Sequence, residues 1–166
     1  SVASRGLGDV YKRQVLLTVR PESDGVPRID WHRLHDGAPN SSALVDPSFA
    51  AADGDWWANR AEYTSGDNAE WYIGFVTPDS EFVAVRQFLG SIAPDLASRL
   101  DDVPPSVKTV AGVEWQVIDR SGFDDPGNDR IIYLTTIPTG GSLIVSGTAD
   151  EHTIELVAER AIQSLK

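Results

Sequence analysis

The sequence contains no cysteine and no methionine among its 166 residues. The absence of cysteine excludes a disulfide framework, a thiolate metal site and a cysteine nucleophile. Basic residues are also few, since 14 Lys and Arg stand against 25 Asp and Glu, which gives a net charge of −11. So acidic a chain repels phosphate backbones, and it has no basic stripe with interleaved aromatic residues. We therefore expect no nucleic-acid partner.

Long hydrophobic runs are absent as well, because a membrane helix needs about 20 apolar residues and the run at 15–19 is only VLLTV. This run is either the end of a membrane helix, or a short edge strand or disordered tail. The preceding segment, Ser1–Gln14, contains GLGDVYKRQ, which resembles translated sequencing-adapter DNA. We expect residues 1–14 to be an artefact, residues 15–28 to be the stub of a membrane anchor with a polar linker, and residues 29–166 to form one domain.

Catalytic and metal-binding motifs are missing too. Neither G-x-S-x-G nor H-E-x-x-H occurs. His32 and His35 have a spacing that would place both rings on one face of a helix, but His152 is distant and offers no third ligand. The acidic segment 124–129 lacks the alternating ligands of a calcium loop. We therefore predict no catalytic residue, no cofactor and no metal ligand.

What the sequence does contain is a series of strands with short turns. Between Asp53 and Phe88, alternation places Trp57, Asn59, Ala61 and Tyr63 on one face of a first strand. In the next strand, Trp71, Ile73 and Phe75 alternate with residues of the opposite face, and a third strand follows the turn at 77–80. Three strands joined in this way predict an antiparallel meander. Further strands are expected at 107–110, 113–119, 130–138 and 142–147.

Helical periodicity appears in two longer segments. Residues 91–103 carry an apolar stripe behind Pro94, and residues 148–165 carry another behind a capping box formed by Thr148 and Glu151. A short helix is expected after Asp30. Together these elements predict an α+β fold, with a mostly antiparallel sheet of about six to seven strands and the two main helices packed on one face.

The tryptophans divide into core and candidate surface residues. Trp71 and Trp115 are expected to share one core with Phe75 and with Leu156 or Val157 of the last helix. Trp56 is expected to point away from Trp57, onto the face of Arg60. An exposed tryptophan beside an arginine is typical of an interface or of a stacking site, so Trp56 and Arg60 form the candidate interaction surface.

Several of these segments together resemble the family catalogued as domain of unknown function 4245. The resemblance extends over Val15–Leu165. It rests on the Arg-Pro step after the apolar run, on Ile29–Trp31, and on Trp57 with Asn59 and Ala61. It also rests on WYIGFVTPDSEFVAVRQ (71–87), GVEWQVID (112–119) and SLIVSGTAD (142–150). Members of this family look like single-pass membrane proteins of high-GC Gram-positive bacteria with an extracytoplasmic domain. The resemblance therefore implies a location on the outer side of the cell membrane, and it supplies no catalytic or binding residue.

Three functions remain open at this point. The sequence favours a non-enzymatic, membrane-tethered module that binds an envelope protein or assists an envelope process. The alternative is a carrier of a small apolar ligand or lipid, with an aromatic-lined pocket. A metal-dependent hydrolase that uses His32 and His35 is the third, and it is the least supported.

Overall fold

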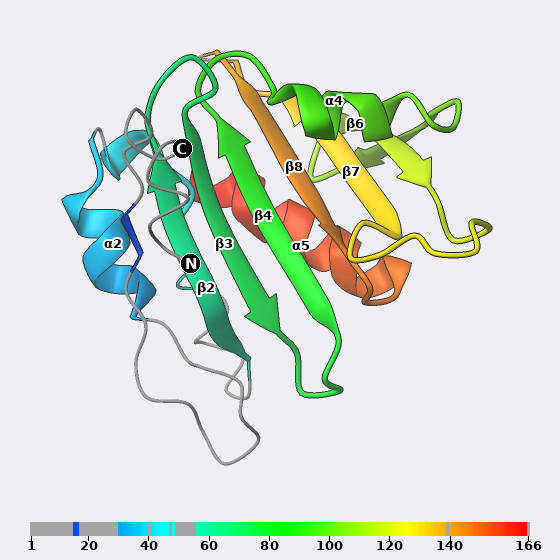
Figure 1. Cartoon of the computed structure of the whole chain (residues 1–166), viewed down its shortest axis with the longest axis horizontal. Helices are drawn as coiled ribbons and strands as arrows, with labels where there is room; N and C mark the ends of the chain where they lie inside the picture. The colour runs from blue at the N-terminus through cyan, green and yellow to red at the C-terminus, as the bar shows by residue number, and fades with distance from the viewer. Residues whose placement is uncertain are drawn as a thin grey trace, which may run out of the picture.

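The architecture is one antiparallel sheet with helices on both of its faces (Figure 1). The computed structural model describes residues 15–16, 30–39, 41–46, 48, 56–138 and 140–165. Within these residues the strand order is β1-β2-β3-β4-β8-β7-β6-β5. The α+β class and the antiparallel sheet are therefore confirmed, with seven strands and the two-residue β1 at one edge. The strands are β1 (Val15–Leu16), β2 (Trp57–Thr64), β3 (Glu70–Val76), β4 (Phe82–Phe88), β5 (Ser106–Val110), β6 (Val113–Asp119), β7 (Ile131–Thr136) and β8 (Ser142–Gly147); the helices are α2 (Trp31–Gly37), the 3-10 helix η1 (Ser41–Ala43), α4 (Pro94–Leu100) and α5 (Glu151–Ser164).

Two meanders meet in the middle of the sheet. The predicted meander β2-β3-β4 ends at β4, α4 leads the chain to the far edge, and β5-β6-β7-β8 return until β8 lies against β4. At this junction Val85 pairs with Val145. Gly147 also lies at the junction, where a Cβ would collide with the carbonyl oxygen of Phe82. Glycine at this position therefore allows the two central strands to approach each other closely.

The inner face of the sheet carries the larger core, which α2 and α5 cover. Trp71, Phe75 and Trp115 are fully buried there, together with Val157 of α5, as the alternation predicts. The indole Nε1 of Trp71 donates a hydrogen bond of 3.1 Å to the carbonyl oxygen of Val45. This bond fixes the segment that follows α2 to the middle of the sheet.

A second polar anchor holds the same segment from β4. The side-chain amide of Gln87 donates to the carbonyl oxygen of Ala43 at 2.9 Å and accepts from the backbone N–H of Val45 at 2.8 Å. Trp31 and Leu34 are buried residues of the adjacent α2, as the sequence predicts. The segment from α2 to η1 is thus held by apolar burial and by satisfied backbone groups.

The start of α5 differs from the sequence prediction. The capping residue is Asp150, whose carboxylate accepts from the backbone N–H of Thr153 at 2.8 Å, so the capping box of Thr148 and Glu151 is wrong. Thr148 is still engaged at the end of β8, where its hydroxyl accepts from the backbone N–H of Phe82 at 2.9 Å. Because the Thr148 hydroxyl accepts this hydrogen bond from β4, it does not cap the helix, and α5 begins after Asp150.

The sequence predicts the two main helices, α4 and α5, on one face of the sheet, but they lie on opposite faces. Leu96 of α4 is buried against the outer face of the sheet, opposite to α5 (Figure 1). An amphipathic stripe requires an apolar surface but does not say on which face it lies. On this face Leu96 packs with buried residues of the second meander, Ile118, Ile132 and Ile144, and with Phe88 at the end of β4.

Two sequence predictions fall outside the described residues. They concern the artefact at 1–14 and the anchor stub with its linker at 15–28, of which only residues 15–16 are described. Among the helices that the structure describes, none is long and apolar enough to span a membrane.

Candidate binding groove

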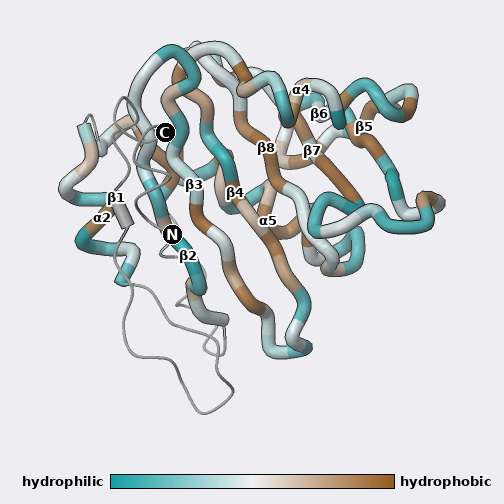
Figure 2. The backbone as a smooth tube through the Cα atoms, viewed as in Figure 1, coloured by the Kyte–Doolittle hydropathy of each residue, from teal (hydrophilic) through white to brown (hydrophobic). Residues whose placement is uncertain are grey.

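The outer face of the sheet is apolar over the second meander and polar over the first. α4 covers the apolar part, whereas β2, β3 and β4 carry charged side chains on the polar part, among which Arg60 is about half exposed. Figure 2 shows the largely hydrophilic β2 and the more hydrophobic β7 and β8. Two adjoining hollows of about 770 Å³ and about 420 Å³ lie over this polar part. Both are lined by Arg60, Arg86 and Arg99. We call the combined hollow the arginine groove.

A β-bulge in β2 places Arg60 in this groove. The register with β3 shifts between Ala58 and Arg60, so that Asn59 is the extra residue. As a result, Ala58 and Ala61 both face the inner core, although three positions separate them. The prediction of one continuous face from Trp57 to Tyr63 is therefore wrong in its first half, because strict alternation does not hold across a bulge.

The bulge also separates the two candidate interaction residues. Trp56 packs partly buried against the inner core, with its ring edge-on to Phe75 at a centroid distance of 6.5 Å. Arg60 lies on the other face of the sheet, over Tyr72. The structure does not bring Trp56 and Arg60 onto one surface. Whether either residue contacts a partner stays a prediction, and Arg60 is the one that lines the groove.

Tyr72 forms the floor of the smaller hollow of the groove. The guanidinium groups of Arg60 on β2 and Arg86 on β4 lie 4.9 and 4.8 Å from its ring centroid, which is cation–π geometry. Arg60 also donates to Glu62 at 2.8 Å, and Arg86 donates to Glu70 at 3.3 Å. Burial is the largest cause that raises the pKa of Tyr72 and the pKa of Glu70. The phenol of Tyr72 is thus a neutral hydrogen-bonding group between two cations.

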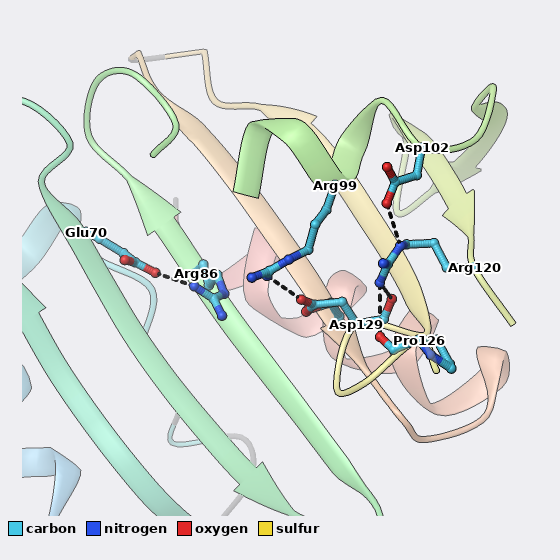
Figure 3. A network of polar contacts seen from close by, with 8 residues as sticks. Glu70, Arg86, Arg99, Asp102, Arg120, Pro126 and Asp129 are labelled. Atoms are coloured by element: carbon cyan, nitrogen blue, oxygen red, sulfur yellow. Dashed lines mark hydrogen bonds and ion pairs between the residues drawn. The ribbon is translucent and has the colours of Figure 1, made fainter. Parts of the chain in front are cut away.

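Asp129 lines the groove on the side of α4, where it lies beside Arg99 (Figure 3). One carboxylate oxygen accepts from Arg99 of α4 at 2.7 Å, and the other accepts from the hydroxyl of Ser146 at 3.0 Å. Asp129 is therefore buried, although it belongs to the acidic segment 124–129. The turn is held from below by Arg120, which donates to the backbone oxygens of Pro126 and Asp129 and to the carboxylate of Asp102.

The histidines lie away from the groove. His32 is exposed on α2, whereas His35 is mostly buried with its ring edge-on to Trp71 at 5.8 Å. His152 lies in the first turn of α5. Among the described residues, no group of three or more His, Cys, Asp or Glu side chains has an arrangement that could hold a metal ion. The structure therefore does not bring the three histidines into one site.

The groove offers hydrogen-bond donors beyond those already used. The side chains of Arg60 and Arg99 are 53% and 42% exposed, and each guanidinium has five N–H donors, of which one makes a described hydrogen bond. The Nε atom of Arg86 is buried without a hydrogen-bond partner in the described part of the chain. The described lining of both hollows contains no histidine and no serine–histidine pair. Chemically, the exposed guanidinium groups equip the groove to bind hydrogen-bond acceptors.

Most of the groove residues were missed by sequence reasoning. Tyr72 and Arg86 did carry a signal, because each alternates with buried residues and so must face away from the inner core. Arg99 and Asp129 carried none, since they are 30 positions apart and meet only through the placement of α4.

Comparison with known proteins adds a family but no activity. No curated protein and no solved structure matches the chain. The family model described as "Protein of unknown function (DUF4245)" matches residues 13–161, which is most of the chain. The matched range includes the segments at 71–87, 112–119 and 142–150 that carry the sequence resemblance. The chain therefore belongs to the DUF4245 family of proteins of unknown function.

Proposed function

We propose that this domain is a non-enzymatic binding module that holds a polar partner in the arginine groove. The observation that carries the proposal is the half-covered outer face. α4 closes the apolar part of that face, whereas the part with Arg60, Tyr72 and Arg86 is hollowed and open. Exposed arginines with spare donors beside a fixed aromatic ring are a common composition of protein-binding surfaces.

The two other functions have less support. A carrier of an apolar ligand would need an enclosed pocket with mostly apolar walls. The inner face, where such a pocket would lie, is instead filled by α5, whose Ile154, Val157 and Ala161 are buried. A metal-dependent hydrolase would need ligands near His32 and His35, and these residues lie on α2 away from the groove lining.

We also propose that the partner is an envelope protein and that the domain is tethered on the extracytoplasmic side of the membrane. Two features support this location: the family resemblance, and the apolar run at 15–19 followed by a linker with two prolines. A tethered domain would meet partners at high effective concentration, so a shallow polar groove with weak intrinsic affinity would suffice.

Site-specific photo-cross-linking tests the binding function. A photoreactive amino acid replaces Ser65, which lines the groove, and in a matched variant it replaces Gln163, an exposed residue of α5. Each variant of the full chain is produced in the source organism. We expect a discrete cross-linked product from position 65 and none from position 163. Equal products from both positions, or none from position 65, would contradict the use of the groove.

A further inference from the structure

Charge is distributed unevenly along the arginine groove. The smaller hollow, of about 420 Å³, is lined by four arginines and two aspartates, which is a formal charge of +2; we call it the narrow end. The larger hollow, which we call the wide end, is lined by three of the same arginines and four carboxylates, which is −1. The narrow end is thus a positive site on a chain whose net charge is −11. The carboxylates are Asp125 and Asp129 at the narrow end, and Glu62, Asp67, Glu70 and Asp95 at the wide end.

The arginines of the narrow end differ in how far they are already engaged. Arg120 is nearly buried and donates to three acceptors, so it acts as a fixed support. Arg60 and Arg99 are about half exposed and each makes one described side-chain hydrogen bond. Arg60 approaches from β2 and Arg99 from α4, with Tyr72 of the floor lining the same hollow. An acceptor group between them would receive donors from two sides.

We propose that the narrow end binds a side-chain carboxylate presented by an extended peptide segment of the partner protein. This inference rests on the binding function proposed above and specifies its ligand. A carboxylate fits because planar guanidinium groups bind it through paired, charge-assisted N–H donors.

Charge alone permits more than one anion at this end. The surplus of +2 accommodates a monoanionic carboxylate or a dianionic phosphate. We choose the carboxylate because a peptide can continue from it into the adjoining hollow, whose lining has the opposite charge.

The wide end indicates what continues the ligand. The wide end, of about 770 Å³, adjoins the narrow end along the sheet, and its carboxylates give its lining the opposite charge. An extended segment with a glutamate at the narrow end and a lysine a few residues away would place each charge beside its complement. Complementary charges of this kind set the orientation and the specificity of a bound segment.

A titration of the isotope-labelled full chain tests the proposal. The probe is the acetylated and amidated peptide GEGSKG, compared with GQGSKG and with inorganic phosphate. The observed signals are the side-chain Nε–H resonances of Arg60 and Arg99 and the backbone amide of Tyr72. We expect these signals to shift when GEGSKG is added at millimolar concentration. GQGSKG should bind at least about tenfold more weakly, because it lacks the carboxylate and so loses one charge-assisted contact.

A charge-neutral double variant provides the control for folding and for bulk charge. Arg60→Gln with Glu62→Gln removes both members of one ion pair and keeps the net charge, so no buried carboxylate is left unpaired. Binding of GEGSKG should weaken at least about tenfold in this variant. It should not change in the matched variant Arg33→Gln with Glu114→Gln, which removes two exposed charges outside the groove lining.

The remaining outcomes separate this inference from the proposed function. Equal affinity for GEGSKG and GQGSKG, or tighter binding of phosphate, would overturn the carboxylate site. If position 65 still cross-links a partner in that case, the binding function stands and only the ligand chemistry is wrong. If no peptide binds and position 65 gives no product, both fail.

Discussion

Trp71 provides the sharpest test of the inner core, because its side chain combines full burial with one defined hydrogen bond. It is 0% exposed, and its indole Nε1 donates to the carbonyl oxygen of Val45, which is itself in a fully buried residue. Trp71→Ala removes the ring and the donor, and truncations of this kind cost about 3–5 kcal/mol of the free energy of unfolding. Trp71→Phe keeps most of the ring but leaves the Val45 carbonyl without its donor, which costs about 1–3 kcal/mol.

The assay is urea denaturation followed by far-UV circular dichroism, because removing a tryptophan would also change the fluorescence signal. Since a domain of this size is stable by about 5–15 kcal/mol, Trp71→Phe is expected to stay folded and to report the lost hydrogen bond together with a smaller loss of buried ring than in Trp71→Ala. Val107→Ala is the matched control, because Val107 is 62% exposed and its truncation should change the stability by less than about 0.5 kcal/mol. A Trp71→Ala variant as stable as this control would refute the assignment of Trp71 to the inner core.

Three further predictions follow from single contacts. Gly147→Ala should lower the melting temperature by several degrees or prevent folding, because the new Cβ would collide with the carbonyl oxygen of Phe82 and force β8 away from β4. Asp150→Ala should lower the melting temperature at neutral pH, because it removes the cap of α5. The backbone hydrogen bond from Thr153 lowers the pKa of Asp150. The stability that the cap contributes is therefore present above about pH 4 and is lost as the pH falls through the folded pKa. For Glu70, burial raises the pKa, so its contribution to stability is present below about pH 4 and is lost as the pH rises through the folded pKa. Denaturation of Glu70→Gln at about pH 4 and about pH 7 should therefore show the variant gaining stability relative to the parent at the higher pH, and a loss would contradict the burial of this carboxyl group.

The sequence predicts the strands well because their alternation is a local property. The inward positions Trp71, Ile73 and Phe75 follow from period two alone, and the structure buries all three. The hairpin of β7 and β8 and the apolar stripe of α5 follow from equally local signals. For the same reason the α+β class could be predicted without knowledge of the strand order.

What the sequence could not predict depends on contacts between distant segments. The bulge at Asn59 reverses the face of Trp56 relative to Arg60, and nothing in the tripeptide Ala-Asn-Arg marks an extra residue. The face that α4 covers is decided by β8 joining β4, which exposes an apolar surface on the outer side. The arginine groove is the consequence of that placement, because Arg99 reaches Asp129 only from there.

The central claim of this account is that the open polar part of the outer face is the partner-binding surface. The most direct measurement is the yield of partner cross-linked from position 65 in two backgrounds, the parent chain and the charge-neutral variant Arg60→Gln with Glu62→Gln. The account predicts that the yield falls at least about tenfold in the variant, because its groove lacks the exposed guanidinium of Arg60. Circular dichroism should show that the variant has the same fold as the parent. An unchanged yield in the folded variant would contradict the claim.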